Sequence, residues 1–280
     1  NALVMSLVVL SVALPHCSSQ KKKPQAEPQK DQQAVVVDEG SQSKSDKSQK
    51  SQPPEHHLVW SYEGSKGPLY WPDLDPAFKV CQTGQRQSPI NLGWSKPVPG
   101  GELEFQYQPG PIRIIDNGHT IRLTFEPGSY ANIHGRKYEL THLDFHSNSE
   151  HALSGNKMSM EAQLFHRSPS GKQAVVAFFI IEGESHPVVQ KLWQYIPAQK
   201  FEEKVITAAT FNPRNLVPSI EHHYHYTGSL THPPCTEGVE WVVLNTPVEI
   251  SRQQILTFRS LYPNNSRPLQ PINSRRVVNH

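Results

Sequence analysis

Short stretches of alternating apolar and polar residues, or of β-branched residues, recur along most of the chain between turn signals. Alternation with a period of two is typical of a β-strand with one buried face. Turn pairs such as Asn117 with Gly118 separate the stretches, and helical patterns are confined to residues 188–195 and 251–261. The strands are expected at residues 112–115, 120–125, 138–145, 158–165, 174–181 and 239–244. We therefore expect one large, mainly β domain with short peripheral helices.

The composition excludes several classes of function. The net charge is only +2 and 19% of the residues are charged, whereas a nucleic-acid-binding protein would show a strong basic excess. We therefore expect no nucleic-acid partner. Three Cys are too few for a small disulfide scaffold or a four-Cys zinc site. The 15 His indicate metal or proton chemistry, although surface His in polar stretches explain most of them equally well.

The first 19 residues have the pattern of a signal peptide. An apolar run at residues 2–14 is too short to span a bilayer comfortably, and small residues near Ser19 suit cleavage. The pattern predicts a secreted, periplasmic or cell-surface protein. The alternative is lipidation of Cys17, which would tether the chain to a membrane, although His16 fits that pattern poorly.

A linker is expected to follow this segment. Residues 20–55 are rich in Lys, Gln, Ser and Pro, and they have almost no large apolar residues outside 35–37. Such a segment buries too little surface to offset the entropy lost on ordering, so we predict a disordered linker. The composition changes at His56, and residues 56–280 are expected to form the folded domain.

Polar residues converge on two of the predicted strands. His142, Asp144 and His146 alternate with apolar residues and therefore share one strand face. Glu161 and Gln163 share a face of the strand at 158–165 by the same argument. The pattern allows a metal site or a buried polar network, and an ordinary solvent-facing strand side is the third interpretation.

Several motifs resemble those of the α-type carbonic anhydrases. They are QSPIN at 87–91, NGH at 117–119, SEH at 149–151, GSLTHPPCTEG at 228–238, Trp241, and RPLQ at 267–270. The order and spacing cover about 57–278. The resemblance implies a single domain around a central, twisted, mostly antiparallel sheet of about ten strands. It also implies reversible hydration of CO2 to bicarbonate by zinc-bound hydroxide, with three His as zinc ligands.

The metal positions depart from the family pattern. The three positions that match zinc ligands are Asp144, His146 and Gln163, so a single ligand His remains. His142 and Glu161 match residues that support the ligands. An Asp side chain is shorter than His and offsets part of the metal charge, while a Gln amide oxygen is a weak zinc ligand. We therefore predict a weak or empty zinc site.

The rest of the expected pocket follows the family. By resemblance, Thr231 accepts a hydrogen bond from zinc-bound hydroxide, Glu150 orients Thr231, and His119 is the proton shuttle. The predicted substrate pocket consists of Val175, Leu230, His232, Val239, Trp241 and Phe165. Phe165 replaces a smaller residue of many relatives and narrows this pocket. A purely structural role explains Glu150, Thr231 and Trp241 as well.

The resemblance also pairs Cys81 with Cys235 in the disulfide of secreted relatives, which agrees with an oxidising compartment. Asn264 begins an Asn-Asn-Ser motif that accepts glycans in eukaryotic secreted proteins.

Two functions remain open from the sequence. The first is a secreted or surface-tethered domain with weak or absent CO2 hydration, which binds an unidentified protein or matrix partner or serves as storage. The alternative is a functional carbonic anhydrase that binds zinc through Asp144, His146 and Gln163 and acts on CO2 and bicarbonate.

Overall fold

The computed structural model describes residues 59–93 and 96–280, so the predicted signal-peptide-like segment and the whole predicted linker lie outside the described residues. The strands are β1 (Asn91–Leu92), β2 (Leu103–Gln106), β3 (Gly110–Asp116), β4 (Ile121–Thr124), β5 (Tyr130–Ile133), β6 (Arg136–His146), β7 (Ala152–Leu153), β8 (Asn156–Lys157), β9 (Met160–Arg167), β10 (Gln173–Glu182), β11 (Glu203–Phe211), β12 (His223–Ser229), β13 (Glu237–Ile250) and β14 (Val278–Asn279). The α-helices are α1 (Trp71–Leu74), α2 (Val80–Thr83), α3 (Pro187–Trp193) and α4 (Arg252–Arg259). Short 3₁₀ helices lie at Gly64–Lys66, Pro76–Phe78 and Pro213–Asn215.

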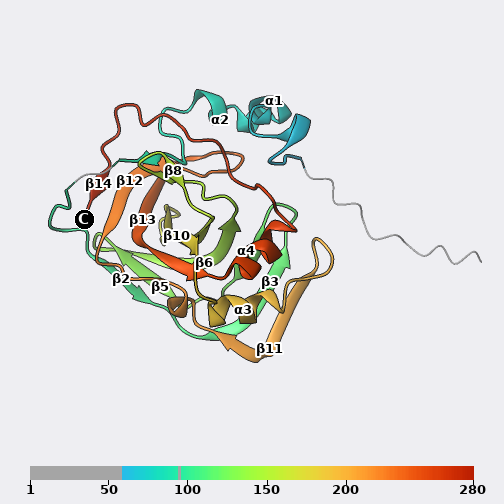
Figure 1. The fold of residues 1–280 in the computed structure, drawn as a ribbon. Helices are drawn as coiled ribbons and strands as arrows, with labels where there is room; N and C mark the ends of the chain where they lie inside the picture. The colour runs from blue at the N-terminus through green and yellow to red at the C-terminus, as the bar shows by residue number, and fades with distance from the viewer. Residues whose placement is uncertain (1–58, 94–95) are drawn as a thin grey trace, which may run out of the picture. The chain divides into compact units, whose positions relative to one another are not determined.

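One sheet of eleven strands carries the site (Figure 1). Its path is β11-β3-β4-β6-β9-β10-β13-β12-β14, and β5 joins β2 to β6. Among the described strands of this sheet, β10 and β13 pair in parallel and the other pairs are antiparallel. The expected mainly β fold with a mostly antiparallel sheet of about ten strands is therefore confirmed.

The six predicted strands and two predicted helices are present as β3, β4, β6, β9, β10, β13, α3 and α4. The helix α4 begins where the sequence predicts, because Ser251 accepts a hydrogen bond from the Gln254 backbone and the Gln254 side chain accepts one from the Ser251 backbone. Figure 1 shows α3 and α4 close together, and α1 and α2 together elsewhere. Within the described residues, no helix is long and apolar enough to cross a membrane.

The central strands are buried on both faces. Leu143, Phe145 and Leu164 point into one hydrophobic cluster, which also includes Val189 and Phe258 of α3 and α4. The other face carries a second cluster around Phe165, Val175 and Trp241. Since side chains alternate along a strand, Asp144, His146 and Gln163 lie on this second face. The sequence expectation that these residues share a face is therefore correct.

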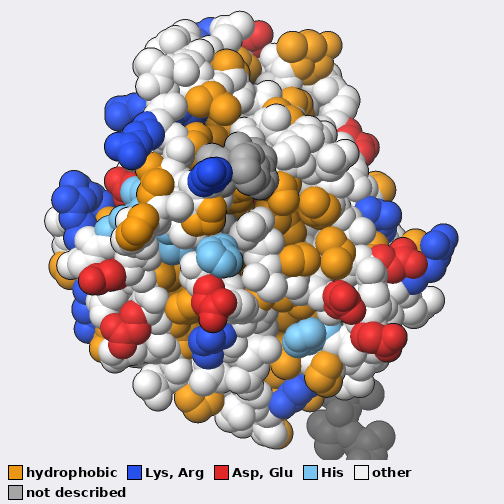
Figure 2. Space-filling model, turned by 60° about the vertical axis from the view of Figure 1, so that its left-hand side comes forward, with side chains coloured by type: hydrophobic (Ala, Val, Ile, Leu, Met, Phe, Trp, Pro, Cys, Tyr) orange, Lys and Arg blue, Asp and Glu red, His pale blue; other side chains and the backbone are white. Residues whose placement is uncertain are grey.

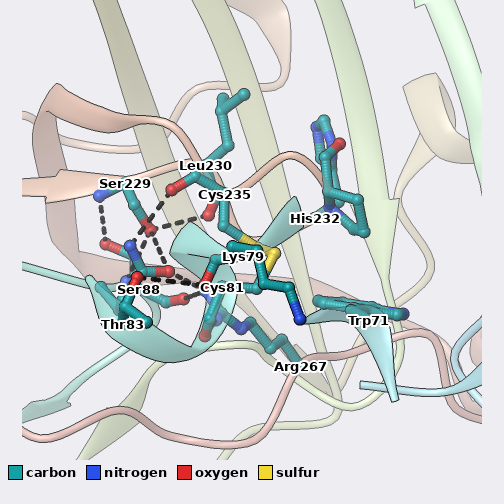
Figure 3. The surroundings of a disulfide bond; sticks show 12 residues. Trp71, Lys79, Cys81, Thr83, Ser88, Ser229, Leu230, His232, Cys235 and Arg267 are labelled. Carbon is teal, nitrogen blue, oxygen red and sulfur yellow. Dashed lines mark hydrogen bonds between the residues drawn. A yellow bond between two sulfur atoms is a disulfide. The ribbon is translucent and has the colours of Figure 1, made fainter. Parts of the chain in front are cut away.

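The predicted disulfide between Cys81 and Cys235 is present (Figure 3). It joins α2 to the loop between β12 and β13, which also carries Thr231. The Arg267 guanidinium donates to the backbone oxygens of Cys81 and Ser88, at 2.7 and 2.8 Å. The disulfide and this buried Arg together fix the loop against the N-terminal part of the domain.

Candidate functional site

The three predicted metal positions lie on adjacent strands. In the β4–β6 register Arg122 lies opposite Asp144, and in the β6–β9 register Asp144 lies opposite Gln163. His146 lies two residues further along β6, opposite Glu161. The sheet therefore brings the predicted ligand positions together, and it adds Arg122, which the sequence reasoning did not place in the site.

Asp144 forms a two-point ion pair with Arg122. The Arg122 Nε and Nη2 atoms donate to the two Asp144 carboxylate oxygens at 2.7 and 2.6 Å. Burial alone would raise the pKa of Asp144, but the charge and hydrogen bonds of Arg122 outweigh burial and lower it to about 2. The carboxylate is therefore ionised at neutral pH, and each of its oxygens already accepts a charged hydrogen bond.

His146 keeps an orientation suited to a metal ligand. Its Nδ1 lies 2.7 Å from the Asn265 backbone oxygen and therefore donates to it. The other ring nitrogen, Nε2, is then the one available as a ligand or acceptor. Of the three predicted ligands, His146 is the one that combines a strong zinc-ligand atom with an orientation that leaves this atom available.

Gln163 is oriented by two carboxylates. Its amide nitrogen donates to Glu150 Oε2 at 2.8 Å and to Glu161 Oε1 at 2.9 Å. Because a carboxylate only accepts, the amide group must present its nitrogen to them. The Gln163 oxygen is buried and has no hydrogen-bond partner among the described residues.

These residues do not fit a zinc ion. Zinc sites in proteins use three or four strong N, S or carboxylate donors. Here one imidazole and one amide oxygen remain, because Arg122 occupies the carboxylate of Asp144. The guanidinium also places a positive charge beside the position that a second cation would occupy. The donor set and the local charge therefore both disfavour zinc.

The expected pairing of Glu150 with Thr231 is not formed. Glu150 instead accepts from the Gln163 amide at 2.8 Å and from the Arg267 backbone nitrogen at 3.0 Å. The buried Thr231 hydroxyl has no partner among the described residues. Gln163 donates to one oxygen of the Glu150 carboxylate and the Arg267 backbone donates to the other, and the predicted roles of Glu150 and Thr231 stay predictions.

His119 is covered by an aromatic side chain. Its ring stacks on Trp60, with centroids 3.6 Å and planes 3° apart, and His232 lies 5.9 Å from the Trp60 ring. Burial lowers the pKa of His119 to about 4, helped by the nearby His232 and Arg122. A proton shuttle works best with a pKa near the working pH. The shuttle role of His119 stays a prediction, and its surroundings do not favour that role.

A small cavity remains between these groups. Its volume is about 40 Å³, and its lining includes Trp60, Tyr62, His119, Arg122, Asp144, His146 and His232. Such a volume holds no more than a few water-sized molecules. Trp60 and Tyr62 come from the segment before α1 and were not predicted to be site residues. The clustered aromatic residues at the start of the folded region were the sequence signal that could have identified them.

The predicted apolar wall packs together. Phe165, Val175, Leu230, Val239 and Trp241 all belong to the second hydrophobic cluster, and each is at most 8% exposed. They do not line the 40 Å³ cavity. The residues are therefore assembled as expected, and their role as a substrate pocket stays a prediction.

The predicted supporting residues lie directly beside the ligand positions. The His142 ring stacks on Phe165 at 4.4 Å, and its Nε2 lies 3.8 Å from an Asp144 oxygen. Glu161 accepts from His151 Nδ1 at 2.9 Å and from the His151 backbone at 2.8 Å. His151 Nε2 in turn lies 2.7 Å from the Tyr226 hydroxyl. Glu161 therefore belongs to a fully hydrogen-bonded network beneath the ligand positions.

A separate group of three His shares no residue with the pocket lining. His134, His225 and His280 each offer a ring nitrogen, and these nitrogens lie within 4.8 Å of one another. The predicted glycan acceptor Asn264 is exposed, as such a site requires.

The comparisons with known proteins agree with this fold. The family model described as eukaryotic-type carbonic anhydrase matches residues 66–280. A carbonic anhydrase of Nostoc sp. is 38% identical over 224 residues, which cover 78% of this chain and 85% of the relative.

Solved structures of the same fold include an enzyme and a protein with a different name. The α-carbonic anhydrase from Thermovibrio ammonificans, in complex with the inhibitor sulfanilamide, has a TM-score of 0.73 and 34% identity and covers 78% of this chain and 98% of its own. Dioscorin complexed with ascorbate has a TM-score of 0.73 and 32% identity, and covers 79% of this chain and 97% of its own.

Proposed function

The chain belongs to the α-type carbonic anhydrase family, and from that membership we propose that it is a non-catalytic member, secreted or held at the cell surface, in which CO2 hydration is weak or absent. The ion pair between Arg122 and Asp144 carries the proposal, because it occupies the carboxylate at a zinc-ligand position. Zinc-bound hydroxide, the reactive group of the family, then has no adequate support.

The energetics of the ion pair strengthen this argument. Asp144 is 2% exposed, and separating it from Arg122 would leave a buried charge without its partner. Breaking a buried pair in this way costs about 3–5 kcal/mol. A zinc ion bound through Asp144 would have to offset that cost with one strong ligand, His146.

We propose a binding or storage role for the fold in place of hydration. The solved structure of dioscorin complexed with ascorbate supports this, since it is a protein of this fold in complex with a small organic molecule. The disulfide between Cys81 and Cys235 supports a location outside the reducing cytosol. Whether a protein, a matrix component or a small molecule is bound is the next question for the purified chain.

A functional carbonic anhydrase is the second candidate. Two observations favour it: His146 keeps its hydrogen bond to Asn265, and the buried Gln163 oxygen has no partner among the described residues. Two donor atoms of the ligand set therefore remain available to a metal.

A CO2 hydration assay on matched variants separates the two candidates. We expect the wild-type chain to show the uncatalysed rate, unchanged by His146→Ala. Asp144→His with Gln163→His should restore some activity, and adding Arg122→Asn should raise it by a further factor of about 10–100, the size typical of residues that support metal ligands.

The opposite result would establish the second candidate. Wild-type hydration well above the uncatalysed rate, lost in His146→Ala, contradicts the proposal. A triple variant without activity would show that other changes in the pocket, such as the aromatic cover, also prevent catalysis.

A further inference from the structure

From the geometry of His134, His225 and His280 we propose a second, independent site on this chain that binds a divalent transition-metal ion such as Zn²⁺. Three segments far apart in the sequence meet there. His134 lies in the turn between β5 and β6, His225 lies on β12, and His280 follows β14. Their ring nitrogens lie within 4.8 Å of one another, and His225 and His280 are half-buried.

Only a small movement would complete the site. With Zn–N distances of 2.0–2.1 Å and tetrahedral angles, ligand nitrogens lie roughly 3.3 Å apart. The rings therefore need to approach by about 1.5 Å at most, which small side-chain rotations allow. Three neutral imidazoles favour Zn²⁺, Cu²⁺ or Ni²⁺ over Mg²⁺ or Ca²⁺, which prefer oxygen ligands.

The backbone and neighbouring groups hold the rings in place. His225 Nε2 lies 3.0 Å from a Glu240 oxygen, and His280 Nδ1 lies 3.3 Å from the Val98 oxygen. Carboxylates and backbone oxygens orient metal-bound His in the same way. The backbone nitrogen of His280 also donates to the backbone oxygen of His223 at 2.8 Å, which fixes His280 against β12.

Two further observations point to a ligand at this place. The cavity of about 230 Å³ beside His134 and His225 leaves room for an ion with its water or an exchangeable group. The neighbouring His223 is 2% exposed, and its Nε2 has no hydrogen-bond partner among the described residues. Its ring centroid lies 5.2 Å from that of His280, close enough to act as a further ligand after rotation.

Arg136 opposes a cation at this place. It lines the same cavity as His134, His225 and Glu240. Its positive charge weakens metal binding but does not occupy a ligand atom. We therefore expect a variant without this charge to bind the metal more tightly. Figure 2 shows His side chains at several places on the surface. Variants of a His outside the cluster are therefore needed as controls for non-specific metal binding.

The test is titration of the tag-free chain with Zn²⁺ alone, by calorimetry or equilibrium dialysis. We expect one saturable site in the micromolar range or tighter. His134→Asn suits the turn, since Asn tolerates its φ of 50°, and His225→Gln keeps a hydrogen-bonding group near Glu240. Each should weaken binding about 10–100-fold, and Arg136→Gln should strengthen it.

Two control variants decide where the metal binds. His186→Ala, a His outside the cluster, and His146→Ala, in the pocket, should leave the affinity unchanged. Absence of saturable binding at 100-fold excess of Zn²⁺ overturns the proposal. So does loss of binding in His146→Ala with retention in His134→Asn and His225→Gln. Near-ultraviolet circular dichroism confirms that each variant is folded, and the d–d absorption of added Co²⁺ provides an independent readout of ligation in any variant of reduced stability.

Discussion

Two groups of buried polar residues, which meet at Glu161 and Gln163 of β9, differ in how fully their hydrogen bonds are formed. In the supporting group, Ser88 contacts the Tyr226 hydroxyl at 2.9 Å, Tyr226 contacts His151, and His151 donates to Glu161. In the ligand group, Arg122 neutralises Asp144, but the Gln163 oxygen lacks a partner among the described residues. The two groups are joined where the Gln163 amide donates to Glu161, and the other hydrogen bonds of the supporting group do not involve the ligand positions.

The physical reason lies in the cost of unpaired buried groups. A polar network inside a protein stabilises the fold only when its members are paired, and a partly paired one destabilises it. In the supporting group, the His151 ring joins the Glu161 carboxylate to the Tyr226 hydroxyl, so a residue without this ring leaves both with one partner fewer. The ligand group accepted Asp144 because Arg122, on the adjacent strand, supplies the opposite charge. Four changes to the chain test this difference between the two groups.

Removing the disulfide should have the largest effect. The loop closed by Cys81 and Cys235 spans 154 residues, and the chain-entropy model gives a loss of about 5 kcal/mol in the free energy of unfolding. Urea unfolding of Cys81→Ala with Cys235→Ala measures the loss. Reduction of the wild-type chain is the control, and a loss below about 1 kcal/mol would contradict the model.

Replacing His151 by Ala should have the next largest effect. Glu161 is fully buried, and it would lose the hydrogen bond from the His151 ring, whereas the backbone nitrogen of residue 151 and the Gln163 amide would still donate to it. Removing a partner from a buried charged group costs about 3 kcal/mol. Urea unfolding measures it against His186→Ala, which we expect to change stability by about 0.5 kcal/mol or less. Equal losses in the two variants would show that the supporting group is not special.

Acid should remove the contribution of the ligand group. The pKa of Asp144 falls from 3.8 in the unfolded chain to about 2 in the folded chain, because Arg122 outweighs the opposing effect of burial. Since one pKa unit corresponds to 1.36 kcal/mol, the pair contributes about 2–3 kcal/mol. This contribution is fully present above about pH 4 and is lost as the pH falls through 2.

The measurement compares wild type with Arg122→Gln plus Asp144→Asn, which has a similar shape and no charge. The wild-type free energy of unfolding should fall more steeply between pH 5 and pH 2.5 than that of the variant. Parallel curves would mean that the ion pair adds no net stability and that Asp144 is not held by it.

The sequence predicted what depends on local pattern. Alternation at 138–145 placed His142, Asp144 and His146 on one face of β6, and Ser251 marked the start of α4. The disulfide and the departures at Asp144 and Gln163 followed from the resemblance, because long motifs identify aligned positions. These features need no knowledge of which strands are neighbours.

Features that depend on strand register were not predicted. Arg122 meets Asp144 because β4 pairs with β6 in one particular register. Gln163 turns its nitrogen toward Glu150 because the loop between β6 and β7 brings that carboxylate near. The three-His cluster needs residues 134, 225 and 280 to converge in space. A buried Asp at a former His position was, however, a signal to look for a cation on the adjacent strand.

Uncovering His119 should have the smallest effect on stability and a specific effect on ionisation. Trp60→Ala removes the ring stacked at 3.6 Å, and an aromatic pair of this kind contributes about 0.5–1.5 kcal/mol beyond burial. Because burial is the main cause of the low pKa of His119, exposure should raise this pKa from about 4 toward its ordinary value of about 6.5. NMR titration of the His119 ring, assigned with His119→Gln, measures the change.

Trp60→Phe is the matched control, since it keeps an aromatic ring over His119 and should keep its pKa low. An unchanged pKa in Trp60→Ala would mean that the charges of Arg122 and His232, rather than the aromatic cover, control the ring. The ligand group would then act on His119 directly, and neutralising Arg122 with Asp144 should shift the His119 titration. A raised pKa would instead show that the aromatic cover and the ion pair affect the pocket independently, so that restoring hydration requires changes at both.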